Sequence, residues 1–94
     1  MSGESDILHA SGVAIEGRGL LILGPSGAGK SELAIRLIAL GASLVADDRT
    51  RVTARNSRLI ATCPSPNIVG LVEARGLGLL RAPAVDSVEL VLAI

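Results

Sequence analysis

A glycine-rich run of eight residues lies between an apolar segment and an amphipathic one. It matches the pattern G-x-x-x-x-G-K-[ST] at every fixed position, with Gly24, Pro25, Ser26, Gly27, Ala28, Gly29, Lys30 and Ser31. The apolar residues 20–23 before it are typical of a strand covered on both faces. Residues 29–40 after it predict a helix that Gly41 ends, with an apolar stripe of Leu33, Ala34, Leu37, Ile38 and Leu40. This order predicts an α/β fold.

The order strand, loop, helix also indicates what the eight residues bind. Glycines let backbone N–H groups turn toward a phosphate, and the helix N-terminus adds its positive end. In such a P-loop, Lys30 reaches the β- and γ-phosphates and the Ser31 hydroxyl ligates Mg²⁺. Lys30 is the only lysine among nine basic residues, which fits a site that needs a compact ammonium. We therefore predict binding of ATP and Mg²⁺; the alternative is a glycine-rich turn with an exposed lysine.

Further strands complete a mixed sheet with the helix on its flank. Hairpins predict antiparallel pairs, and the strand–helix–strand unit predicts a parallel pair. The expected strands are 13–15, 20–23, 43–46, 51–54, 59–62, one that runs from 68 through to 80, and 88–94. Turn signals at 17–19 and at Asn56-Ser57 indicate two hairpins. Residues 1–94 are expected to form a single domain.

Two adjacent acids, Asp47 and Asp48, follow the short strand 43–46. P-loop proteins place a carboxylate for the metal or for the attacking group at this position. Side chains of neighbouring residues on an extended chain point to opposite faces. We therefore expect one acid to face Mg²⁺ and Ser31 and the other to face an incoming hydroxyl. A solvated acidic turn is the alternative.

Three other side chains are weaker candidates. Glu73 and Arg75 would share one face of a strand, where Glu73 could complete a metal site and Arg75 could steady phosphate charge. An exposed ion pair beside a β-bulge would give the same sequence pattern, and is the alternative. His9 is the only histidine, and a lone histidine beside an apolar strand is more often structural.

The composition excludes several classes of protein. Nine basic residues balance nine acidic ones, and the chain has no Phe, Tyr or Trp, which disfavours binding to nucleic acid or to a membrane surface. Cys63 is the only cysteine, so no intrachain disulfide can form. No apolar run approaches the roughly 20 residues of a membrane span, and the polar N-terminus has no leader pattern. A cytoplasmic protein is expected.

Taken together, these residues resemble the C-terminal catalytic domain of the HPr kinase/phosphorylase family. The resemblance is carried by His9, the run Gly24 to Glu32, Leu44-Val45-Ala46-Asp47-Asp48 and Val72-Glu73-Ala74-Arg75-Gly76-Leu77-Gly78. It covers most of residues 8 to 81. The first run is generic to P-loop proteins, whereas the last two blocks make the match specific.

The resemblance implies a kinase that uses ATP and Mg²⁺ to phosphorylate a serine of HPr, the phosphocarrier of the sugar phosphotransferase system. It also implies the reverse reaction, in which inorganic phosphate attacks seryl-phosphate and pyrophosphate is released. By the same likeness Asp48 accepts the serine proton, His9 and Lys30 belong to the active site, and Ser31 and Glu73 hold Mg²⁺. This agrees with the roles argued from the residues themselves, in which Asp47 is the acid at the metal and Arg75 steadies phosphate charge. A homo-oligomer, a hexamer in this family, is implied as well.

The chain also departs from the family pattern. It has no separate N-terminal domain, as in short members, and its last residue is Ile94, before the basic loop and C-terminal helices of the family. We therefore expect a domain truncated at its C-terminal end, with weak phosphorolysis. A P-loop kinase of a small metabolite and a non-catalytic nucleotide-binding module are the alternative functions.

Overall fold

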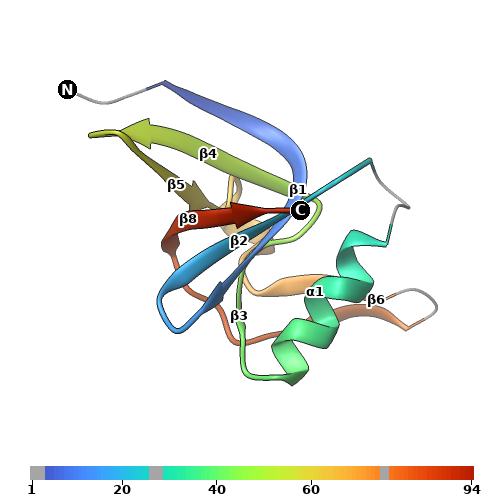
Figure 1. The fold of residues 1–94 in the computed structure, drawn as a ribbon. Helices are drawn as coiled ribbons and strands as arrows, with labels where there is room; N and C mark the ends of the chain where they lie inside the picture. The colour runs from blue at the N-terminus through green and yellow to red at the C-terminus, as the bar shows by residue number, and fades with distance from the viewer. Residues whose placement is uncertain (1–3, 26–28, 75–76) are drawn as a thin grey trace.

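The computed structural model describes residues 4–25, 29–74 and 77–94. Eight strands and one α-helix are present in this part of the chain (Figure 1). Their bounds are β1 Ser5–Ile15, β2 Arg18–Leu23, α1 Lys30–Ala39, β3 Ser43–Ala46, β4 Arg49–Arg55, β5 Arg58–Thr62, a 3₁₀ turn Pro66–Ile68, β6 Leu71–Ala74, β7 Gly78–Arg81 and β8 Ser87–Ala93. The mixed α/β fold predicted from the sequence is confirmed.

The long strand β1 organises the main sheet. Its first half, residues 5–9, pairs antiparallel with β4, and its second half pairs antiparallel with β2 on one edge and β3 on the other. Strand β8 pairs with β2 and with β5, and β5 pairs with β4. Strands β1, β2, β8, β5 and β4 therefore close into a ring, with β3 attached along β1.

Two separate apolar cores lie on the two faces of β1 and β3. Neighbouring residues of a strand point to opposite faces, so Val13 and Leu44 join one core while Ala14 and Val45 join the other. The first core also contains Ile22, Ala34, Ala42 and Val72, and thus lies between the sheet, α1 and β6. The second contains Ala61 and Val88 and lies among the ring strands.

Helix α1 lies against the main sheet, in contact with β1, β2, β3 and β6 (Figure 1). Gly41 ends it as predicted: the Gly41 N–H donates to Ile38 O and the Ala42 N–H donates to Leu37 O. Gly41 has a φ of 112°, a conformation that glycine adopts readily. The apolar stripe is confirmed except at Leu40, which is 84% exposed because it caps the helix and lies beyond its last turn.

Two expectations about the strands of the main sheet need correction. The strand–helix–strand unit makes no parallel pair, because the hairpin already places β1 beside β2 and leaves β3 the far edge of β1. The parallel pair is β2 with β8. The strand expected at 13–15 is the C-terminal end of the much longer β1. The first residues of β1 include polar ones, so the apolar pattern in the sequence does not reveal its full length.

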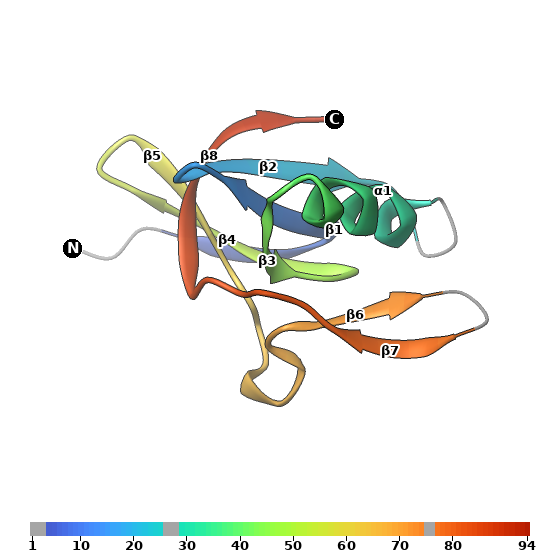
Figure 2. The same ribbon diagram turned by 90° about the horizontal axis from the view of Figure 1, so that it is seen from below.

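The single strand expected from 68 to 80 is a hairpin instead. Strands β6 and β7 pair antiparallel, and Gly78, with a φ of 94°, begins the return strand. Figure 2 shows this hairpin lying apart from the main sheet, on one side of α1. The turn residues 75 and 76 lie outside the described residues. No helix in the described ranges is both long enough and apolar enough to cross a membrane.

Candidate functional site

The candidate site lies where β2 leads into α1, beside the end of β3. Gly29, with a φ of 90°, turns the chain into the helix, so Lys30 and Ser31 occupy its first turn. At the other end of the glycine-rich run the Gly24 N–H donates to His9 O over 3.2 Å. Ser26, Gly27 and Ala28, predicted to contact phosphate, lie outside the described residues.

The Lys30 side chain is buried, with 4% of the residue exposed. Its ammonium donates to Pro25 O at 2.7 Å and lies 3.2 Å from Asp48 Oδ1. A buried ammonium needs such partners, because an unpaired charge away from water carries a large desolvation cost. Lys30 therefore holds a positive charge between the glycine-rich run and the acid that follows β3.

The carboxylate of Asp47 is the acceptor at which several elements meet. Its Oδ1 accepts from Ser31 Oγ and from Ser11 Oγ, each at 2.9 Å. Its Oδ2 accepts the Glu73 backbone N–H at 2.9 Å, and lies 3.1 Å from Ser31 Oγ. Because Ser31 donates its hydrogen to Asp47, the lone pairs of its oxygen stay available for a cation.

Asp48 adopts a left-handed backbone conformation with a φ of 66°. Its N–H donates to Ser11 Oγ at 3.0 Å and its carbonyl accepts the Ala10 N–H at 3.0 Å. The side chain is 42% exposed. The two adjacent acids thus have different partners on the first two residues of α1: Asp47 bonds Ser31 and Asp48 pairs with Lys30.

Glu73 and His9 also lie beside this site, although mainly through their backbones. Glu73 bonds Asp47 by its N–H while its side chain is exposed, and His9 contacts Gly24 by its carbonyl with its side chain exposed. Arg75, the remaining candidate, lies outside the described residues. Within the described ranges no group of three or more His, Cys, Asp or Glu side chains gathers as a metal site.

Ser11 is a site residue that the sequence reasoning missed. It is 0% exposed, lies within β1, and bonds both Asp47 and the backbone of Asp48. The sequence feature that could have pointed to Ser11 is its place as a polar residue in the middle of the apolar-rich segment 7–15.

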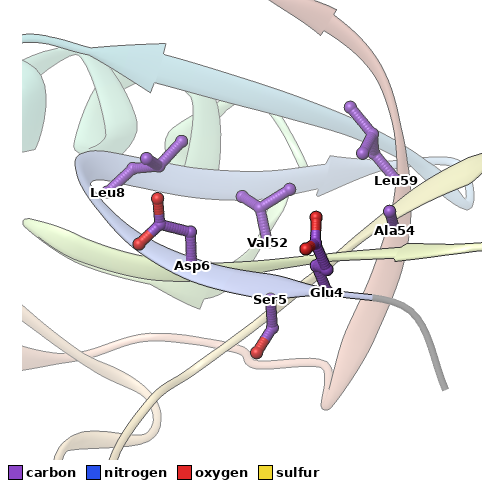
Figure 3. A pocket seen from close by; sticks show the side chains of 7 residues that line it. All are labelled: Glu4, Ser5, Asp6, Leu8, Val52, Ala54 and Leu59. Carbon is purple, nitrogen blue, oxygen red and sulfur yellow. The ribbon is translucent and has the colours of Figure 1, made fainter.

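An open pocket of roughly 630 Å³ lies elsewhere, over β1, β4 and β5 (Figure 3). Glu4, Asp6, Leu8 and Val52 point to one side of the strands in Figure 3, whereas Ser5 points to the other. The pocket shares no lining residue with the candidate site.

Comparison with known proteins gives the family of this chain. A sequence model described as the HPr Serine kinase C-terminal domain matches residues 2–91. The chain belongs to this family. Its fold is similar to the solved structure of the HPr(Ser) kinase/phosphatase from Coxiella burnetii, with a TM-score of 0.82 and 34% identity over 94% of this chain and 57% of the other.

Curated relatives of this family member carry the name HPr kinase/phosphorylase. One from Clostridium tetani is 41% identical over 90% of this chain and 28% of its own length. Another from Limosilactobacillus reuteri is 46% identical over 78% of this chain and 23% of its own length. The chain therefore spans about a quarter of the length of these relatives.

Proposed function

We propose that this chain binds ATP and Mg²⁺ through a P-loop at residues 24–31 and transfers the γ-phosphoryl group to a serine of the phosphocarrier HPr. The observation that carries the proposal is the division of partners between two adjacent acids. Asp47 bonds Ser31, and Asp48 pairs with Lys30. In this proposal Ser31 and Asp47 are the pair that would hold the metal, and Lys30 and Asp48 are the pair that would act on the transferring group. The names of the relatives support HPr as the acceptor.

The residues present suit Mg²⁺. This ion prefers oxygen ligands, keeps several waters, and in phosphoryl-transfer sites uses one or two carboxylates together with substrate phosphates. The Ser31 hydroxyl and the Asp47 carboxylate supply such oxygens. Glu73, whose backbone N–H donates to Asp47, carries the third candidate carboxylate. When bound, Mg²⁺ neutralises charge on the transferring phosphates.

Asp48 has the position of a general base in this proposal. Its carboxylate is held by the buried Lys30 and is partly open to solvent, so an acceptor hydroxyl can approach it. Asp48 takes the proton as the serine oxygen bonds to the γ-phosphorus; the bond between that phosphorus and the β–γ bridging oxygen breaks, and ADP leaves. Lys30 offsets the negative charge of the phosphates.

The reverse reaction uses the same groups. An oxygen of inorganic phosphate bonds to the phosphorus of seryl-phosphate, the bond from that phosphorus to the serine oxygen breaks, and pyrophosphate forms. Asp48, protonated, returns its proton to the serine oxygen. His9 and Arg75 are further residues of the proposed site; the His9 carbonyl accepts the Gly24 N–H at the start of the P-loop.

The test is to incubate the chain with Mg²⁺, γ-labelled ATP and purified HPr, and to measure label on HPr serine. A parallel reaction uses HPr in which the acceptor serine is alanine. Transfer to the parent HPr alone supports the proposal. Binding of ATP without label on HPr would overturn the kinase assignment and favour a nucleotide-binding module.

A further inference from the structure

We propose that the Ser11 hydroxyl is a positioning residue that sets both acids of the site. It is buried within β1 and bonds two consecutive residues that have different roles. The inference deepens the proposed function, on which it rests. Ser11 does not touch substrate in this proposal; it acts through Asp47 and Asp48.

The first action of Ser11 is on the Asp47 carboxylate. Within the described part of the chain this carboxylate accepts from three donors, namely the hydroxyls of Ser11 and Ser31 and the Glu73 N–H. Ser31 is itself a proposed magnesium ligand, and Glu73 lies in the separate hairpin β6–β7. Ser11, from the central strand β1, is the donor fixed to the main sheet. Hydrogen bonds to charged groups are the stronger class, so Ser11 keeps Asp47 directed at Ser31.

The second action is on the backbone of Asp48. A φ of 66° is uncommon for a residue with a side chain, and such conformations persist where surrounding bonds determine them. Here the Asp48 N–H donates to Ser11 Oγ and the Asp48 carbonyl accepts the Ala10 N–H. Two adjacent residues of β1 thus hold both sides of this turn, from which the Asp48 side chain reaches Lys30.

One hydroxyl can do both only because it is a donor and an acceptor at once. Its hydrogen goes to Asp47 Oδ1 and its oxygen accepts from Asp48 N. An alanine at this position removes both bonds and leaves the Asp48 N–H without this acceptor. Alteration of residues that orient metal ligands typically lowers metal affinity or activity roughly 10- to 100-fold.

Thr50 provides a matched control. It is also 0% exposed, and its hydroxyl donates to Ala10 O at 2.8 Å, but it bonds neither Asp47 nor Asp48. Thr50→Val therefore removes a buried hydrogen bond between β4 and β1 at nearly constant volume. Both Ser11→Ala and Thr50→Val should lower the melting temperature, and only Ser11→Ala should alter the site.

The experiment titrates Mg²⁺ at fixed concentration of a fluorescent ATP analogue and records nucleotide binding. The chain has no Phe, Tyr or Trp, so the probe's signal is free of protein fluorescence. We expect Ser11→Ala to raise the Mg²⁺ midpoint about tenfold or more, while nucleotide binding in EDTA and the Thr50→Val midpoint stay within threefold of the parent. Ser11→Thr, which keeps the hydroxyl, should restore the parent midpoint. Transfer to HPr, measured in parallel, should fall with Ser11→Ala.

Should Ser11→Ala fail to fold, Ser11→Cys gives the same comparison, because a thiol is a much weaker donor and acceptor of similar size. A Ser11→Ala or Ser11→Cys midpoint within threefold of the parent overturns the inference, even where HPr is phosphorylated. Conversely, the expected midpoint shift without label on HPr supports the role of Ser11 and overturns only the proposed acceptor.

Discussion

Lys30 and Asp48 form an ion pair in which the two partners differ sharply in exposure: the lysine side chain is 3% exposed and the aspartate 42%. The ammonium therefore lies inside the protein while its carboxylate partner faces the solvent. This asymmetry suits a site where the cation meets phosphate within a loop and the carboxylate meets a group that arrives from outside. The first two predictions follow from this pair.

Lys30→Met should strongly slow phosphoryl transfer while the fold persists. The methionine keeps the apolar stem, and the partly exposed Asp48 remains hydrated after it loses the ammonium. Loss of one preorganised charge partner lowers kcat about 10²- to 10³-fold in comparable sites. Turnover with ATP and HPr is the measurement, and Arg36→Met on the exposed side of the same helix is the control. Turnover of Lys30→Met within threefold of the parent would contradict the P-loop assignment.

Asp48→Asn should slow transfer to serine roughly 10²- to 10⁴-fold, the usual contribution of a positioned general base. ATP affinity should change little, because the carboxylate addresses the acceptor. Asparagine tolerates the left-handed backbone at this position, so the turn is kept. Single-turnover transfer and ATP binding are measured together.

Asp47→Asn should instead raise the Mg²⁺ requirement, because Asp47 is the acid bonded to Ser31. The readout is the Mg²⁺ midpoint of nucleotide binding. If Asp48→Asn raises that midpoint and Asp47→Asn leaves it unchanged while it slows transfer, the roles of the two acids are reversed.

Glu73→Gln tests the contribution of the Glu73 carboxylate separately from that of its backbone N–H. The N–H that bonds Asp47 remains in the variant, so any change reports the carboxylate. We expect the Mg²⁺ midpoint to rise several-fold, as for loss of one oxygen ligand, while the exposed Glu89→Gln on β8 serves as the control. Equal midpoints in the two variants would remove Glu73 from the metal site.

Gly19→Ala should destabilise the fold by about 1–3 kcal/mol, the usual cost of overpacking. A Cβ at Gly19 would lie 2.6 Å from Val88 Cγ1 and 2.7 Å from Glu89 O, where β2 meets β8. At Gly12 the nearest atoms would be 3.4–3.6 Å away, an ordinary contact, so Gly12→Ala is the matched control. Urea unfolding measures both. Equal midpoints for the two variants would show that β2 and β8 do not meet so closely.

Local patterns predicted the parts of this fold that depend on neighbouring residues. The helix with its glycine end follows from spacing, and the hairpin at Asn56-Ser57 is confirmed by a positive φ at both residues. The strand pairs β1–β4 and β2–β8 join distant segments, and nothing in either segment identifies its partner. The return at Gly78 was missed because the apolar residues on both sides of it read as one continuous strand.

The candidate site was predictable in its residue types more than in its contacts. Spacing indicated Lys30, Ser31 and the two acids. The rule that neighbouring side chains of an extended chain point to opposite faces predicted different partners for Asp47 and Asp48, as the structure has them. That rule assumes an extended backbone, whereas Asp48 adopts a left-handed conformation and turns the chain sharply. Ser11 could not be identified, because its role depends on β1 lying against the end of β3.

The ring of strands has a consequence for the order in which the chain can fold. Strand β8, last of the described strands, joins β2 near the beginning of the chain to β5. Until β8 arrives, β2 and β5 each expose an edge of unpaired backbone groups. Contacts between distant segments form slowly, because the loop-closure entropy must be overcome first. A nascent chain thus passes through a stage with two open sheet edges, the kind of surface on which partly folded proteins associate.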